Sequence, residues 1–177
     1  MENDYIELIG LADLDTAGHG KPKRIESLEC IPWTMDLVYD ELFSLGGYLA
    51  SYQLPAGKVL FDEGSREPYL VILIEGKIEI LKLDSTMCLR LVTTLRDGKV
   101  FGEMTLMDGE PRSATARAKE DSVIYVLTKE NYRFMQEQDP RLALIITLKM
   151  AKFVSQKLRQ TTGQWVEMIE QYRKLGH

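Results

Sequence analysis

Residues 101–118 read FGEMTLMDGEPRSATARA and place a glycine, a short helical stretch and an arginine close together along the chain. Gly102 permits a close approach of the backbone to a ligand. The stretch that begins at Glu103 is long enough for one helical turn, whose free N–H groups and dipole attract an anion. The turn DGEP directs Arg112 back toward that helical N-terminus, and Ser113 adds a hydroxyl and an N–H beside it. Arginine binds phosphate oxygens through paired, charge-assisted hydrogen bonds, so the segment predicts an anion site.

Glu103 supplies a carboxylate beside this predicted anion site. A carboxylate accepts hydrogen bonds from a sugar hydroxyl, which has protons to donate. The alternative is that Glu103 and Arg112 pair with each other inside a structural core, with no ligand between them. The residue types alone leave both interpretations open.

Short apolar runs separated by glycine turns surround this segment and predict a mainly β domain, a sandwich or a barrel. Pro55-Ala56-Gly57 and Gly76 mark two of the turns between the runs. The expected strands are residues 48–54, 58–61, 69–75, 77–83, 89–95 and 122–127.

Helical patterns flank the strands on both sides. Residues 36–45 are expected to form a short helix that ends at Gly46-Gly47, and residues 129–138 a second. Asp139 fits an N-cap and Pro140 the first turn of a final helix that reaches about residue 175, roughly 54 Å at 1.5 Å per residue. Apolar and small residues at heptad spacing predict dimerisation through this helix, the alternative being a helix folded back on its own strands. They are Leu144, Leu148, Ala151, Ser155, Leu158, Thr162, Trp165, Ile169 and Tyr172.

Residues 1–35 are expected to form an irregular N-terminal extension, punctuated by glycines and prolines. Its basic run Lys21-Pro22-Lys23-Arg24 is interpreted as a solvated loop. Trp33 is the residue expected to pack this extension against the domain. The predicted organisation is therefore an extension over residues 1–35, a domain over 36–160, and a distal helical part over 161–177 with a role in dimerisation.

Composition narrows the function classes. The formal net charge is −5 and the pI about 5.2, which argues against a general nucleic-acid binder. Cys30 and Cys88 show no metal-ligand spacing, so a reducing compartment is expected. The N-terminus has no secretory pattern and no apolar run is long enough to span a bilayer. These features predict a soluble cytoplasmic protein without a membrane partner.

The segment 101–118, with its Phe-Gly-Glu and Pro-Arg-Ser-Ala steps, resembles the phosphate-binding cassette of the cyclic-nucleotide-binding family, which includes protein kinase A regulatory subunits, cyclic-nucleotide-gated channels and the catabolite activator protein. The resemblance covers roughly residues 36–160, including Leu60-Phe61, Glu63-Gly64 and Glu75-Gly76. It implies a double-stranded β-helix (jelly-roll) barrel with flanking helices and a long C-terminal helix.

The resemblance also implies residue roles toward cAMP or cGMP. Glu103 is expected to hold the ribose 2′-hydroxyl, Arg112 to neutralise the cyclic phosphate, and Ser113 to contact that phosphate while leaving the choice of base open. The other expected ligand-binding positions are Gly102, Met104 and Thr105 along the sugar-phosphate, and Ile80 and Val92 beside the base. Thr105 stands where the family often has Ala or Ser. The final helix lacks the Thr-Ser pair that reads adenine in the catabolite activator, so the base-capping residue stays open among Lys157, Gln160, Thr161 and Trp165.

The function expected is that of a regulatory module that binds a cyclic nucleotide, holds no metal and passes a signal through its final helix to an unidentified effector protein or its dimer mate. A degenerate, ligand-free member acting as an interaction scaffold is the alternative. A cupin-like enzyme needs clustered metal ligands, and the two histidines, His19 and His177, lie outside the expected strands, so no catalytic residue is assigned. Family transcription factors continue into a helix-turn-helix domain that does not fit before His177, so no DNA partner is expected.

Overall fold

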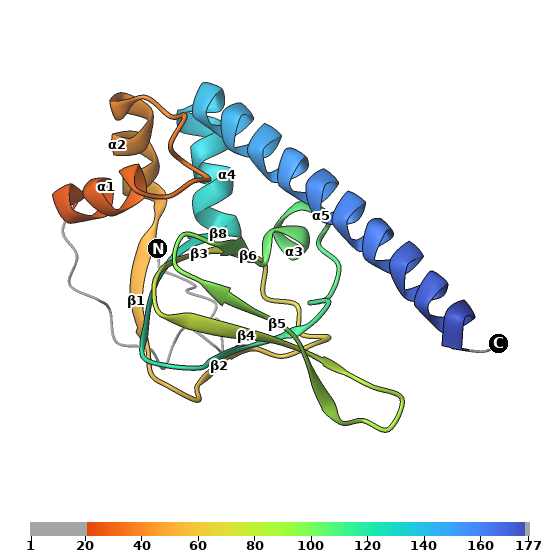
Figure 1. Ribbon diagram of the computed structural model, residues 1–177. Coiled ribbons are helices and arrows are strands. Elements are labelled where there is room, and N and C mark those ends of the chain that lie inside the picture. The colour runs from red at the N-terminus through yellow and green to blue at the C-terminus, as the bar shows by residue number, and fades with distance from the viewer. Residues whose placement is uncertain (1–20, 176–177) are drawn as a thin grey trace.

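The structure is a computed structural model that describes the backbone of residues 21–175 and the side chains of residues 25–174. Helices lie at both ends of the described chain and strands between them (Figure 1). The elements in order are α1 Lys21–Glu29, α2 Tyr39–Tyr48, β1 Ala50–Leu54, β2 Val59–Phe61, β3 Tyr69–Glu75, β4 Lys77–Leu83, β5 Leu89–Arg96, β6 Val100–Phe101, α3 Glu103–Asp108, β7 Thr115–Ala118, β8 Ser122–Thr128, α4 Lys129–Gln138 and α5 Pro140–Leu175.

The strands form two antiparallel, four-stranded sheets, with strand orders β1-β8-β3-β6 and β2-β7-β4-β5. The predicted mainly β fold with flanking helices is confirmed. The predicted barrel is not closed, because the pairings among the described strands stay within each sheet. β6 has two residues, Val100 and Phe101, and both pair with β3, so it offers little edge on which β5 could continue the first sheet.

Strand β3 shows why the first sheet is buried on both faces. Tyr69, Val71 and Leu73 point into the core between the two sheets, where residues of β2, β6, β7 and β8 meet them. Leu70 and Ile72 point the opposite way, into a second core made with the helices. Successive side chains of a strand face opposite sides, so an unbroken apolar run is what such a strand requires.

The N-terminal extension is more ordered than the sequence predicted. Its basic run begins helix α1 instead of a loop, because Ile25, Leu28 and Ile31 recur at near-helical spacing and bury against the helical core. Helix α2 likewise continues through Gly46 to Tyr48, and Gly46 faces α1, where a Cβ built on it would lie in ordinary contact with Ile25 at 3.9 Å. The expected packing of Trp33 on this core is confirmed. Residues 1–20 of the predicted extension lie outside the described residues, as do His19 and His177.

Helix α5 begins as the sequence predicted. Asp139 accepts a hydrogen bond at its Oδ1 from the Leu142 N–H at 3.1 Å, which makes it the N-cap. The first turns bury Ile146 and Met150 against the helical core, whereas the distal part projects past the sheets and exposes its side chains (Figure 1). Among the described residues, no helix is long and apolar enough to cross a membrane.

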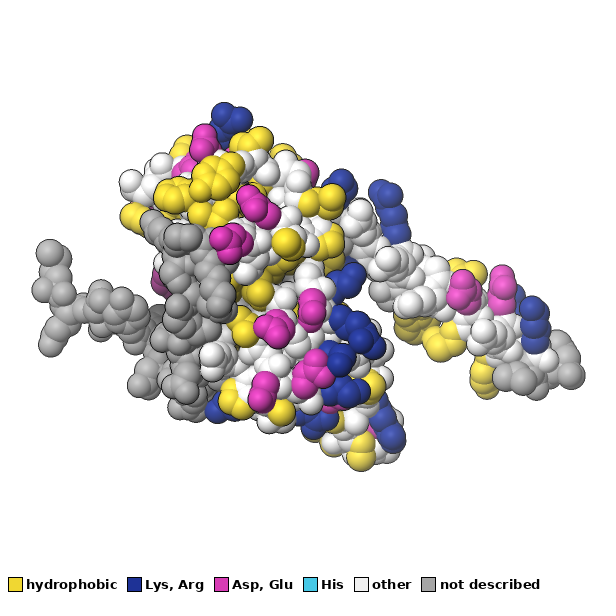
Figure 2. Space-filling view, turned by 60° about the vertical axis from the view of Figure 1, so that its left-hand side comes forward, with side chains coloured by type: hydrophobic (Ala, Val, Ile, Leu, Met, Phe, Trp, Pro, Cys, Tyr) yellow, Lys and Arg dark blue, Asp and Glu magenta, His cyan; other side chains and the backbone are white. Residues whose placement is uncertain are grey.

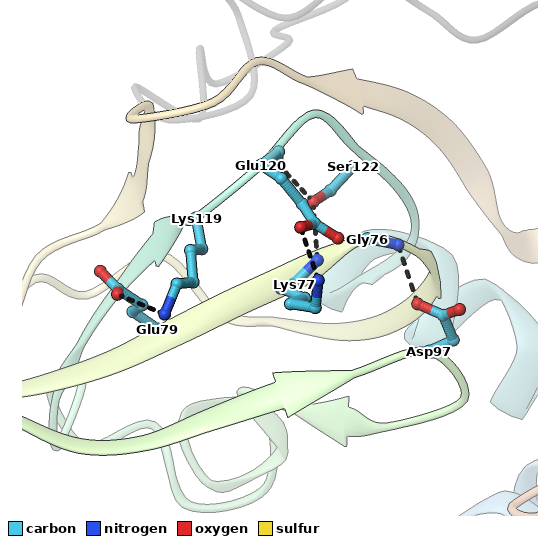
Figure 3. Close-up of polar contacts among 7 residues, drawn as sticks. All are labelled: Gly76, Lys77, Glu79, Asp97, Lys119, Glu120 and Ser122. Atoms are coloured by element: carbon cyan, nitrogen blue, oxygen red, sulfur yellow. Dashed lines mark hydrogen bonds and ion pairs between the residues drawn. The ribbon is translucent and has the colours of Figure 1, made fainter.

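A network of polar contacts fixes the turn from β3 into β4 (Figure 3). Gly76 has φ +107° and donates its N–H to Asp97 Oδ1 at 2.8 Å, and a Cβ on it would lie 2.2 Å from Ser122 Oγ. Lys77 reaches Glu120 at 2.7 Å on the far side of the same turn. The contacts hold β4 against the strands that flank the cassette, the name used below for residues 101–118.

Candidate functional site

The second residue of the cassette, Gly102, is a glycine that the geometry requires. Gly102 has φ +78° and caps α3, and Gly109 closes the same helix with φ +74°. A Cβ at Gly102 would lie 2.7 Å from Arg112 Nη1 and 2.9 Å from the Tyr69 carbonyl oxygen. The close approach expected at Gly102 therefore exists, and the group that approaches is the guanidinium of Arg112.

Arg112 is almost fully buried, with 3% of its surface exposed. Its Nη1 donates to the Gly102 carbonyl at 2.8 Å and its Nη2 to the Tyr69 carbonyl at 3.0 Å. The guanidinium lies 4.0 Å from the ring centroid of Phe61 and 4.3 Å from that of Tyr69. Its Nε is buried and has no hydrogen-bond partner.

Electrostatics leave this guanidinium undercompensated. Burial lowers the pKa of Arg112, and the nearby Tyr69, Glu67 and Glu103 act in the opposite direction. Among the described residues, no carboxylate forms an ion pair with it; both of its bonded acceptors are neutral carbonyls. Glu67 and Glu103 act on the guanidinium only from a distance, and a buried cation without a bonded counter-charge costs roughly several kcal/mol even after relaxation. The arrangement is therefore suited to receiving an anion.

Glu103, the first residue of α3, is also buried, with 1% of its surface exposed. Its Oε1 lies 3.0 Å from Nζ of Lys157, which reaches down from α5. Its Oε2 is buried and has no partner. Glu103 and Arg112 do not pair with each other in the structure. Glu103 pairs instead with Lys157 of α5.

Backbone contacts hold the rest of the cassette in place. The Arg112 N–H donates to the Ser65 carbonyl at 2.7 Å, and the Gly64 N–H donates back to the Arg112 carbonyl at 2.8 Å. Lys82 of β4 bridges the Ser113 carbonyl at 2.8 Å and Glu63 at 2.9 Å. The Leu83 N–H and Lys82 hold the pKa of Glu63 below its usual range. Ser113 itself is exposed and accessible to a ligand.

The other sequence-predicted positions lie in different environments. Thr105 is buried in α3, whereas Met104 is partly exposed on it. Ile80 lies half-buried against the core between the sheets. Val92 is 61% exposed and unpaired, because β5 bulges where Ile80 pairs with Thr93 and Leu81 with Leu91. Of the base-capping candidates, Lys157 is engaged by Glu103, and Gln160, Thr161 and Trp165 are exposed.

Sequence reasoning missed two contributors to the site, and it considered the third, Lys157, only as a residue that caps the base. Phe61 and Tyr69 enclose the guanidinium, and Lys157 binds the buried carboxylate. Tyr69 alternates with Val71 along β3, so a period of two could have placed its ring between the sheets. No local signal predicts that Lys157 pairs with Glu103, because the two residues lie 54 positions apart in the sequence.

A cleft of about 560 Å³ lies apart from the cassette, between the segments 32–36 and 97–100 and helix α5. Lys149 on its wall is already compensated by Asp36 and by the Trp33 carbonyl, and the orphaned atom there, Trp33 Nε1, belongs to a neutral side chain. The orphaned atoms of the cassette belong to two charged side chains, Glu103 and Arg112, which makes it the stronger candidate site. Within the described part of the chain, no group of His, Cys, Asp and Glu side chains is arranged to hold a metal ion.

Comparison with known proteins identifies the fold of the domain. Residues 52–139 match the family model of the cyclic nucleotide-binding domain. The cyclic AMP receptor protein of Thermus thermophilus is 29% identical over 106 residues, which cover 60% of this chain and 47% of that protein. A cyclic nucleotide-binding domain from Methylobacillus flagellatus superposes with a TM-score of 0.77 at 22% identity over 93% of both chains.

The regulatory subunit of a cAMP-independent protein kinase A from Trypanosoma brucei superposes with a TM-score of 0.63 at 19% identity, over 78% of this chain and 51% of that one. The chain spans half or less of the length of the first curated relatives that it matches. The matched segment contains the whole cassette, with its buried arginine and its buried glutamate. The chain belongs to the family of cyclic nucleotide-binding domains.

Proposed function

We propose that this domain binds a cyclic nucleotide, cAMP or cGMP, and works as a regulatory module without chemistry of its own. The observation that carries the proposal is the buried Arg112 guanidinium, whose Nε–H has no partner and whose contacts in the described chain are neutral. A cyclic phosphate supplies both the missing negative charge and acceptor oxygens. The residues present therefore fit an anionic ligand.

Glu103 supports a hydroxyl donor beside that phosphate. Its Oε2 is buried without a partner and can accept only, so it suits the 2′-hydroxyl of a ribose and repels an anionic oxygen. Gly102, Met104, Thr105 and Ser113 are proposed to line the sugar and phosphate. Ile80 and Val92 are proposed to wall the base, which leaves the choice between adenine and guanine to residues on α5.

The second candidate function is a scaffold that keeps the fold without the ligand. The contacts of Arg112 favour it, because two carbonyls and two aromatic rings already occupy much of the guanidinium surface. The regulatory subunit of a cAMP-independent protein kinase A from Trypanosoma brucei shares the fold. The orphaned Nε of Arg112 and Oε2 of Glu103 support the ligand-binding proposal instead, since a scaffold gains nothing from two unsatisfied buried groups.

The signal is proposed to pass through α5 to a second copy of this chain and then to an effector protein, without DNA. Support comes from the distal part of α5, where apolar side chains line one side of the helix and charged ones another (Figure 2). Leu158, Trp165, Ile169 and Tyr172 of the heptad seam are all exposed. A parallel or antiparallel partner helix would cover this stripe.

Calorimetric titration with cAMP and, separately, cGMP tests the proposal. Arg112→Ala is expected to weaken binding more than tenfold, because each charge-assisted hydrogen bond to phosphate is worth about 1.5–3 kcal/mol. Arg133→Ala is the matched control, since Arg133 is exposed on α4, and it should bind as the wild type does. A folded wild-type protein that gives neither heat nor a thermal shift with either nucleotide would replace this proposal with the scaffold.

A further inference from the structure

Helix α5 is tied to the cassette by one charged side chain. In Figure 1 the helix passes beside α3, and Lys157 bridges the two with its Nζ 3.0 Å from Oε1 of Glu103. The same Nζ lies 4.6 Å from the ring centroid of Phe153, one turn earlier on α5. The ammonium is therefore held by a carboxylate on one side and an aromatic face on the other.

The two partners differ in what they need from this contact. The Glu103 carboxylate is buried and requires a counter-charge, whereas nearly half of the Lys157 side chain is exposed and loses little water. Breaking such a pair from the exposed side leaves an uncompensated buried charge, which is strongly destabilising. Lys157 thus supplies the counter-charge for the buried Glu103 carboxylate.

The ion pair with Lys157 occupies one of the two oxygens of the Glu103 carboxylate. Oε1 is bound to Lys157 and Oε2 is buried, unpartnered and on the same rigid group. A hydroxyl that donates to Oε2 does not compete with Lys157 for the same oxygen. The lysine fixes the orientation of the carboxylate and leaves one acceptor ready.

We infer that Lys157 is a positioning residue: it holds the Glu103 carboxylate oriented for the ligand hydroxyl, and so links occupancy of the site to the docking of α5 on the cassette. The inference rests on the proposed function for the identity of the ligand. Its consequence is reciprocal, because a contact that raises ligand affinity by some factor is itself strengthened by the ligand by that factor. The exposed apolar stripe lies on the distal part of α5, so its position depends on how firmly α5 is docked and therefore on whether the ligand is bound.

Two measurements on the full chain test this inference. The first is hydrogen–deuterium exchange of residues 103–108 and 150–160 without any nucleotide. Lys157→Met keeps the length of the side chain and removes its charge, and is expected to speed exchange in both segments at least about fivefold. Lys174→Met makes the same change on exposed distal α5 and should leave both segments as in the wild type. Lys157→Arg restores a cation and should restore most of the protection.

The second measurement is the dissociation constant for cAMP. Lys157→Met is expected to weaken it about 5- to 150-fold, with Lys157→Arg close to the wild type. In a Glu103→Gln background, Lys157→Met should have little further effect, because the two residues act through one contact.

The two measurements distinguish the docking role of Lys157 from its positioning role. Unchanged exchange in Lys157→Met overturns the docking role, whatever the ligand does. Equal or tighter cAMP binding by Lys157→Met overturns the positioning role. A wild type that binds neither cyclic nucleotide overturns the proposed function and the positioning role with it, and the exchange data then still decide whether Lys157 docks α5.

Discussion

The two glycines that bound α3 offer a direct test of where the Arg112 guanidinium lies. Gly102 has φ +78° and ψ +6°, and Gly109 has φ +74° and ψ +4°, so the backbone strain of an alanine is the same at both positions. Their surroundings differ. A Cβ at Gly109 meets nothing within 4 Å, whereas a Cβ at Gly102 would lie 2.7 Å from Arg112 Nη1.

The magnitudes follow from that difference. Left-handed backbone costs an alanine about 1–2 kcal/mol, of which the stiffer unfolded chain returns about 0.4–1 kcal/mol. Gly109→Ala should therefore lower the free energy of unfolding by about 1 kcal/mol. Gly102→Ala adds the loss of the charge-assisted bond from Nη1 to the Gly102 carbonyl, about 1.5–3 kcal/mol, for a total of about 2.5–4 kcal/mol.

Thermal unfolding of both variants measures this. At about 2–4 °C per kcal/mol for a chain of this size, the Tm should fall by about 2–4 °C in Gly109→Ala and by about 5–16 °C in Gly102→Ala. Gly102→Ala should also weaken cyclic nucleotide binding, because the new methyl group displaces the Arg112 guanidinium from its position. Equal losses of Tm in the two variants would show that the Arg112 guanidinium does not lie against Gly102 and does not bind its carbonyl.

Three other changes address separate parts of the molecule. Trp165→Glu combined with Ile169→Glu places charges in the exposed seam of α5 and should abolish the proposed dimer, so sedimentation showing a monomer already in the wild type at high micromolar concentration contradicts that proposal. Glu103→Gln should weaken cAMP binding and bind 2′-deoxy-cAMP about as well as cAMP; a variant that still discriminates between them points to another partner for the hydroxyl. The Thr86 hydroxyl, Arg90 and the Cys88 N–H lower the pKa of Asp84, so its stabilisation of the β4–β5 turn is full above the unfolded value of 3.8 and is lost as the pH falls through the lower folded value. Amide chemical shifts of Thr86 that titrate at or above 3.8 would contradict this.

Strands with a strong local pattern were predictable from the sequence. Residues 69–75 and 77–83 were predicted with the bounds that the structure gives β3 and β4, because apolar β-formers end there at Gly76. The start of α5 was predictable for a similar reason, since Asp139 and Pro140 are both terminus signals. Strand β7, residues 115–118, escaped notice because its sequence, TARA, has no apolar run and its place in the sheet comes from pairing with β2 and β4.

The site was predictable in its residues and not in its contacts. Glu103 and Arg112 stand out along the chain, yet their partners come from β2, β3 and α5, which only the folded arrangement brings together. The sequence left open a direct ion pair between the two side chains. In the structure Arg112 is buried against β2 and β3, and Glu103 against α5, so the two side chains bind different partners.

The way these two buried charges fail to pair argues for a ligand more strongly than either does alone. A direct ion pair between Glu103 and Arg112 would have been the simplest way to compensate both groups inside the fold. Instead Arg112 is held by neutral carbonyls with Nε orphaned, and Glu103 by Lys157 with Oε2 orphaned. One unsatisfied group donates and the other accepts, so a single molecule that carries an anionic oxygen and a hydroxyl completes both. Local conflicts of this kind are expected at functional sites, where the missing partner is the ligand.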